Sequence, residues 1–139
     1  FNLAKDGFDY IILDAPCSGS GIQRRRPEVP WTKTRQQLET LVTIQSNLLD
    51  ASWRILKNKG ILIYCTCSVF YNEGEGQVVK FLKRRKNVNR KSAPGLIYPT
   101  IGKDYSLKYN LEDVLDTADL NYIGNDGFFY AMLEKQESS

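Results

Sequence analysis

The sequence of 139 residues is 42% hydrophobic and 25% charged, and its net charge is +3. This composition suits a single globular domain and excludes a disordered tail. No run approaches the roughly 18 apolar residues of a membrane span, and residues 1–6 lack the basic-then-apolar layout of a signal peptide. We therefore expect a cytoplasmic protein with no membrane partner.

Cysteine and histidine usage limits the chemistry further. The three cysteines are an odd number, which argues against a disulfide framework. The sequence has no histidine, so the commonest metal ligand and the commonest general base are both missing. Any base catalysis must use a carboxylate, a thiolate or water.

The first apolar run, residues 8–13, has the short β-branched pattern of a strand buried on both faces. Asp14 ends this run, and Pro16 cannot continue a ladder. Residues 18–21 read Ser-Gly-Ser-Gly and predict a loop whose backbone approaches a ligand closely. In open α/β sheets, ligands bind at the carboxyl ends of the strands, where this loop would lie.

A long amphipathic helix is predicted from about residue 34 to residue 57, because apolar residues recur there at threes and fours. Residues 58–60, Asn-Lys-Gly, provide a stop signal. Residues 61–65 then form a second buried strand. Strand, helix and strand make a right-handed βαβ unit with a parallel strand pair.

The second half of the sequence is less regular. Asn72 and Glu75 have capping-box spacing and predict a helix that runs to about residue 85. Prolines and glycines break the periodicity between residues 88 and 122, where residues 111–120 form either a short helix or an ordered loop. Residues 125–127, Asn-Asp-Gly, are a turn signal before a final strand over residues 128–133.

Two cysteines follow the two predicted strands. Cys17 and Cys67 would therefore face one pocket, where a thiol of lowered pKa acts as a nucleophile. Taken singly, each cysteine is more often a small buried apolar residue. Cys65, inside its strand and opposite in direction to Thr66, is assigned to the core. Three cysteines without histidine disfavour zinc, so no metal site is predicted.

Residues 14–19, Asp-Ala-Pro-Cys-Ser-Gly, and residues 66–68, Thr-Cys-Ser, carry a family resemblance. Together with residues 125–131 they resemble the RNA 5-methylcytosine methyltransferases of the Sun/Fmu (16S rRNA methyltransferase B) and Nop2 group. The resemblance covers most of the chain and is loosest from about residue 88 to 122. It implies a Rossmann-like class I methyltransferase fold of the α/β class, in its carboxyl-terminal part only, with flanking helices and a final antiparallel strand.

The resemblance also implies roles for individual residues in S-adenosylmethionine-dependent methylation of cytosine carbon 5 in rRNA or tRNA. Cys67 is then the nucleophile, and Cys17 assists product release. Asp14 is similar to the family aspartate that lies beside the methyl donor and the target base, and Pro16 would shape the loop that holds Cys17. A thiolate added at carbon 6 makes carbon 5 reactive toward an electrophilic methyl group.

One element of the family is missing from the sequence. The glycine-rich turn that holds the amino-acid and ribose parts of S-adenosylmethionine does not occur in it. We therefore expect residues 1–139 to be a partial methyltransferase domain without the amino-terminal cofactor-binding half, and to bind the cofactor poorly or not at all. The alternative is a non-catalytic RNA-binding or assembly fragment. An unpaired edge strand would favour a homo-oligomer or pairing with the missing half.

Basic residues suggest where RNA would bind. Arg24, Arg25 and Arg26 follow the first cysteine motif, and basic clusters beside a cleft suit a polyanion. A second basic stretch, between residues 80 and 91, is equally well explained as a solvated surface. Trp31 and Tyr71 are candidates for stacking on a flipped base, although packing in the core is at least as common for such residues.

Overall fold

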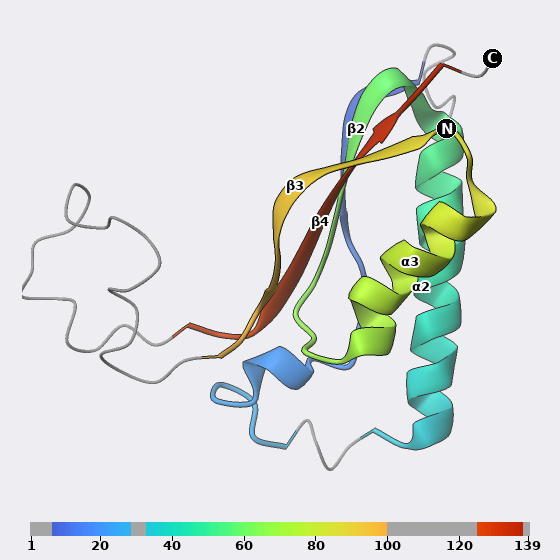
Figure 1. Cartoon of the computed structure of the whole chain (residues 1–139). Helices are drawn as coiled ribbons and strands as arrows, with labels where there is room; N and C mark the ends of the chain where they lie inside the picture. The colour runs from blue at the N-terminus through green and yellow to red at the C-terminus, as the bar shows by residue number, and fades with distance from the viewer. Residues whose placement is uncertain (1–6, 29–32, 100–124, 138–139) are drawn as a thin grey trace, which may run out of the picture.

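A computed structural model describes residues 7–28, 33–99 and 125–137 of the chain (Figure 1). The strands are β1 (Phe8–Asp14), β2 (Leu56–Thr66), β3 (Val88–Ile97) and β4 (Phe128–Lys135). The helices are α2 (Arg35–Ile55) and α3 (Glu75–Arg84), with single helical turns η1 (Ser20–Ile22) and η2 (Tyr71–Glu73). Within the described ranges, no helix combines the length and the apolar character needed to cross a bilayer.

The strands form one mixed sheet in the order β1-β2-β4-β3. β1 and β2 are parallel and are connected through α2, which confirms the predicted βαβ unit. β4 pairs antiparallel with β2, which confirms the final antiparallel strand. β3, which the irregular sequence did not predict, pairs antiparallel with β4 at the sheet edge. Pro94 is tolerated there because edge strands and register shifts accommodate a missing amide donor.

The hydrophobic core lies between the sheet and the two helices, which both cover the same face (Figure 1). Alternate residues of β2 and β4, such as Leu62 and Leu133, point into it and are fully buried. Trp53 of α2 and Phe81 of α3 meet them, with their rings in edge contact at a centroid distance of 5.2 Å. Burial of these side chains is the main contribution to holding helices and sheet together.

The other face of the sheet is much less covered. We call it the open sheet face; in register across the strands it comprises Tyr10, Ile12, Ile61, Ile63, Cys65, Tyr130 and Met132. The prediction that β1 is buried on both faces was therefore wrong, since Tyr10 is 76% exposed and Ile12 is 72% exposed. The reason is positional. β1 is the edge strand of the described sheet, and α2 packs on only one side of it.

Two helix boundaries also differ from the predictions. α2 begins with a capping box in which the side chains of Thr34 and Gln37 each accept a hydrogen bond from the backbone amide of the other, and it ends at Ile55. Residues 58–60 lie within β2, where Lys59 adopts a φ of 64°. Asn72 does not cap α3, because it lies in η2 and the cap position is Gly74, without a side-chain bond. Trp31 and residues 111–120 lie outside the described residues.

Candidate active site

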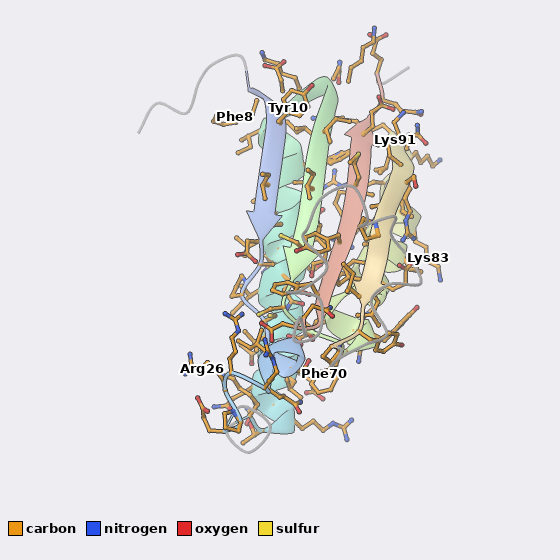
Figure 2. The ribbon with its side chains drawn as sticks, turned by 90° about the vertical axis from the view of Figure 1, so that its left-hand side faces the viewer. Phe8, Tyr10, Arg26, Phe70, Lys83 and Lys91 are labelled. Atoms are coloured by element: carbon orange, nitrogen blue, oxygen red, sulfur yellow. The ribbon has the colours of Figure 1, made fainter. Side chains whose placement is uncertain are left out.

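The two cysteine motifs lie side by side because β1 and β2 run parallel and end at the same level. Asp14 is the register partner of Cys65. Beyond the strands the two loops remain paired, since the amide of Ala15 donates to the Cys65 carbonyl and that of Gly21 to the Cys67 carbonyl, both at 3.0 Å. Figure 2 shows this end of the molecule, with Arg26 and Phe70, opposite the end with Phe8 and Tyr10.

The two loops bring the sulfurs of Cys17 and Cys67 to within 3.4 Å of each other. Hydrogen bonding to the Cys17 thiol lowers the pKa of Cys67 to about 7, despite partial burial. The same contact, together with burial, raises the pKa of Cys17. The contact therefore favours the thiolate at Cys67, with the Cys17 thiol donating to it, and the thiolate is the form that attacks electrophiles.

Cys65 does not belong to this pair, nor to the core. It points away from Thr66, as predicted, but lies partly exposed on the open sheet face instead of among the core residues. Its Sγ lies 3.9 Å from Oδ1 of Asp14. Burial and the Asp14 charge raise the pKa of Cys65 to about 11, so this cysteine stays a thiol at neutral pH. Cys65 and Cys67 are two positions apart, so alternation alone would place them on the same face. They differ because β2 ends at Thr66 and Cys67 lies in the loop beyond it, next to Cys17.

The other residues predicted from the first motif are placed at the same end of the sheet. Asp14 is exposed at the end of β1. Pro16 is also exposed, and its carbonyl accepts a hydrogen bond of 2.9 Å from the Gln45 amide of α2. The long helix thus holds the loop that carries Cys17.

A buried polar cluster that the sequence patterns did not predict lies beside the two thiols. Its members are Ser18, Ser20, Gln45, Ser68 and Glu73, all of them 5% exposed or less. One signal was available in the sequence. Position 45 lies on the apolar stripe of the long helix, between Val42 and Leu49, yet it holds a glutamine. A polar residue on such a stripe indicates a buried partner.

The Arg24 to Arg26 segment is tied to the turn before β4. Nη2 of Arg25 lies 2.6 Å from Oδ2 of Asp126, and Nε of Arg24 lies 4.0 Å from Oδ1 of the same carboxylate. Nε of Arg26 lies 2.9 Å from Oε1 of Glu28. All three arginine side chains remain more than half exposed. They are therefore accessible at the rim of the site while being held in place.

The predicted close approach of backbone at residues 18–21 does occur, but within the protein. A Cβ on Gly21 would lie 2.0 Å from the carbonyl oxygen of Gly127, so only glycine fits. The Gly127 amide donates to the Gly21 carbonyl at 2.7 Å. The β4 turn therefore closes directly on the cysteine loop.

Much of the second basic stretch is neutralised locally. Arg84 and Arg85 pair with Asp50, and Arg90 pairs with Glu75. Lys91 pairs with Glu134. These ion pairs favour the interpretation of that stretch as a solvated surface.

A groove of about 540 Å³ lies beside the site, between α2 and η2. It is lined by Arg35, Leu38, Glu39, Val42, Phe70, Tyr71, Asn72, Glu73 and Lys80. Tyr71 is 63% exposed there and does not pack in the core. Within the described ranges, no three acidic, cysteine or histidine side chains come together as a metal cluster.

Comparisons with solved structures define the class of protein to which the fold belongs. The fold is similar to the crystal structure of PH0851, with a TM-score of 0.69 and 26% identity over 96% of this chain and 28% of that one. It is also similar to NSun6 from Pyrococcus horikoshii with SFG, with a TM-score of 0.60 and 27% identity over 92% and 30% of the two chains. The structure is thus part of a Rossmann-like methyltransferase fold, as predicted.

The family follows from sequence. Residues 2–134 match the family model described as 16S rRNA methyltransferase RsmB/F, and the chain belongs to this family. It is 39% identical over 129 residues to ribosomal RNA small subunit methyltransferase B of Photorhabdus laumondii, and 40% identical over 128 residues to that of Pasteurella multocida. The matches cover 93% and 92% of this chain but only 27% and 26% of those relatives.

Proposed function

We propose that this chain carries the catalytic thiols of an S-adenosylmethionine-dependent enzyme that methylates carbon 5 of cytosine in RNA, most simply rRNA. The observation that carries the proposal is the Cys17–Cys67 pair, whose sulfurs lie 3.4 Å apart at the ends of two parallel strands. The family and the names of the curated relatives support RNA methylation. A protein that acts on rRNA would work in the cytoplasm.

Cys67 is the nucleophile of the proposed reaction. Its thiolate forms a bond to carbon 6 of the base, and the electron pair of the carbon 5–carbon 6 double bond becomes available at carbon 5. The lowered pKa of Cys67 supports this assignment, because about half of the thiol is ionised near pH 7. Cys17, with its raised pKa, is unsuited to the same role.

Asp14 is the residue of this chain that would face both the cofactor and the base. An exposed carboxylate at the end of a parallel strand fits the cationic sulfonium of S-adenosylmethionine, whose bound form would supply an electrophilic methyl group. The same side chain would lie beside ring nitrogen 3 of the base when Cys67 adds. The glycine-rich turn for the remainder of the cofactor does not occur in this sequence, so we assign that role to a segment outside it.

Product release reverses the first step. A base removes the carbon 5 proton, the carbon 5–carbon 6 double bond re-forms, and the bond between carbon 6 and the Cys67 sulfur breaks to give the thiolate again. Cys17 assists this release, and its position next to the Cys67 sulfur supports that role. Since this sequence has no histidine, a base supplied by its own side chains is a carboxylate or a thiolate, and water is the alternative.

RNA would approach across the arginine segment and the groove. Arg24, Arg25 and Arg26 are exposed at the rim and would contact phosphates. Tyr71, exposed in the groove, offers a ring on which an unpaired base stacks. Pro16 shapes the loop between the target base and Cys17.

Release of tritium from carbon 5 tests the proposed reaction directly. The full natural chain is mixed with unmodified rRNA that carries tritium at carbon 5 of cytosine, with and without S-adenosylmethionine. We expect tritium to enter water only with the cofactor, in amounts equal to the methyl groups transferred. The Cys67→Ser variant should release none.

Two results would overturn the proposal. Methyl transfer without tritium release would place the methyl group on another atom. RNA binding without either methyl transfer or tritium release would leave the alternative, a non-catalytic RNA-binding module.

A further inference from the structure

Glu73 is a carboxylate buried between the two cysteine loops, with 1% exposure. Its Oε1 accepts from the backbone amide of Ser18 at 2.9 Å and from the Gln45 side-chain amide at 3.0 Å. Its Oε2 accepts from the hydroxyls of Ser18 and Ser68, the latter at 2.6 Å. One carboxylate therefore receives hydrogen bonds from both loops and from α2.

The two serines stand next to the two catalytic candidates. Ser18 follows Cys17 and Ser68 follows Cys67 in the chain. A bond from Glu73 to each serine therefore fixes the backbone one residue away from each sulfur. Ser20 adds a second connection, because its hydroxyl lies 2.9 Å from that of Ser68 and accepts from the Val69 amide at 3.0 Å.

Glu73 is itself held firmly in place. Its carbonyl accepts a hydrogen bond of 2.6 Å from the buried Tyr64 hydroxyl of β2. Gly74, the next residue, packs against the Phe129 ring so closely that a Cβ would lie 2.8 Å from it. Gln45, which donates to Glu73, accepts in turn from Gln77 of α3 at 3.2 Å. Both helices and the sheet thus determine where the carboxylate lies.

We propose that Glu73 is a positioning residue whose carboxylate ties the Ser18 and Ser68 loops together and so sets the separation of the Cys17 and Cys67 sulfurs. Its consequence for catalysis rests on the proposed methyltransferase function. The separation itself is a property of the free protein, so it is measured without RNA or cofactor.

The arrangement of donors makes it possible to remove the negative charge of Glu73 while keeping its hydrogen bonds to both loops. In Glu73→Gln, the amide oxygen replaces Oε1 and accepts from the same two N–H groups, while the amide nitrogen replaces Oε2 and donates to the serine hydroxyls, which rotate to accept. The hydrogen bonds to both loops are kept, and the negative charge of the side chain is lost. Glu73→Ala removes both. Glu75→Ala, which removes the partly exposed carboxylate paired with Arg90, is the matched control.

The test is the rate at which a short bifunctional thiol reagent, fluorescent only when both arms have reacted, bridges Cys17 and Cys67. All variants carry Cys65→Ala, so that the third thiol of this sequence does not compete. We expect the Glu73→Gln and Glu75→Ala variants to be bridged at nearly the parent rate, and Glu73→Ala about tenfold more slowly, since bridging depends on proximity.

A second readout separates positioning from general loss of stability. The charges and thiols that face Cys67 are Asp14, Cys17 and Glu73. The negative charge of Glu73 raises the pKa of Cys67. Glu73→Gln removes that charge and keeps the hydrogen bonds to both loops, so it should shift the alkylation midpoint of Cys67 to lower pH.

The proposal is overturned if folded Glu73→Ala is bridged at the parent rate. If Glu73→Ala does not fold, Glu73→Asp replaces it, because the shorter side chain cannot reach both loops. Bridging of that variant at the parent rate would equally overturn the proposal. Failure of methyl transfer in every variant, with bridging as expected, would count against the proposed function only.

Discussion

The strand-end site, just beyond β1 and β2, and the open sheet face, which includes residues of the same two strands, are held in opposite ways. In the strand-end site, formed by Cys17, Ser18, Cys67, Ser68 and Glu73, hydrogen bonds between buried groups connect the loops. On the open sheet face, apolar side chains such as Tyr10 and Ile12 are mostly exposed. The close placement that the proposed chemistry requires is therefore provided by contacts within this chain.

Cys65 and Cys67, although only two residues apart, lie in different regions. Cys67 lies in the strand-end site with a lowered pKa, and Cys65 lies on the open sheet face with a raised one. The environments differ because Cys65 lies within β2, whereas Cys67 lies beyond its last residue, Thr66, where the loop brings it against Cys17.

The largest expected effect is the loss of methyl transfer when Cys67 is changed, with the same change at Cys65 as the comparison. Cys67→Ser should reduce methyl transfer by the full natural chain at least about 1000-fold, because a hydroxyl does not ionise at neutral pH. Cys65→Ser should stay within about threefold of the parent. Initial rates of methyl transfer to rRNA measure both, and equal losses would remove the distinction between the two regions.

The two faces of the sheet should respond differently to truncation. Leu62→Ala should lower the free energy of unfolding by about 2–5 kcal/mol, because the side chain is fully buried. Ile12→Ala, at a site that is 72% exposed, should cost at most about 1 kcal/mol. Urea unfolding compares them. A similar cost for Ile12 would mean that the open sheet face is covered.

Two glycines test the contact between the cysteine loop and the β4 turn. Gly21→Ala should lower the free energy of unfolding by about 2–3 kcal/mol, because the added Cβ collides with the Gly127 carbonyl. Gly95 has a positive φ but nothing within 4 Å, so Gly95→Ala should cost only about 1 kcal/mol. Urea unfolding measures the free energy of both variants. A smaller loss of stability for Gly21→Ala than for Gly95→Ala would contradict the close contact between Gly21 and Gly127.

The smallest expected effect is on pH dependence. Only the thiolate is alkylated, so the rate at Cys67 should rise with pH and level off above its pKa of about 7. Cys17→Ala removes the donor that stabilises the thiolate, so the midpoint should move to higher pH and alkylation at pH 7 should slow by up to about tenfold. Mass spectrometry of the modified peptide follows the rate. An unchanged midpoint would show that Cys17 does not set the pKa.

Several of these features could be predicted from the sequence. Apolar runs and helical periodicity predicted β1, α2, β2 and β4, and the cysteine motifs predicted that Cys17 and Cys67 lie at one edge. β3 could not be predicted, because Pro94 and Gly95 interrupt the pattern of a strand and only pairing with β4 stabilises it.

The cluster around Glu73 could not be predicted either. An acidic residue before a helix usually lies at the surface. Its burial depends on donors that are 28 and 55 residues away in the chain, Gln45 and Ser18, and such long-range pairing leaves no local pattern.

The most direct test of the central claim is the trapping of a covalent protein–RNA complex. The full natural chain with Cys17→Ser is incubated with rRNA and S-adenosylmethionine and run on a denaturing gel. We predict a persistent adduct, because Cys67 still adds to the base while release is impaired, and no adduct when Cys67→Ser is added. An adduct that survives Cys67→Ser would contradict the assignment of Cys67 as the nucleophile.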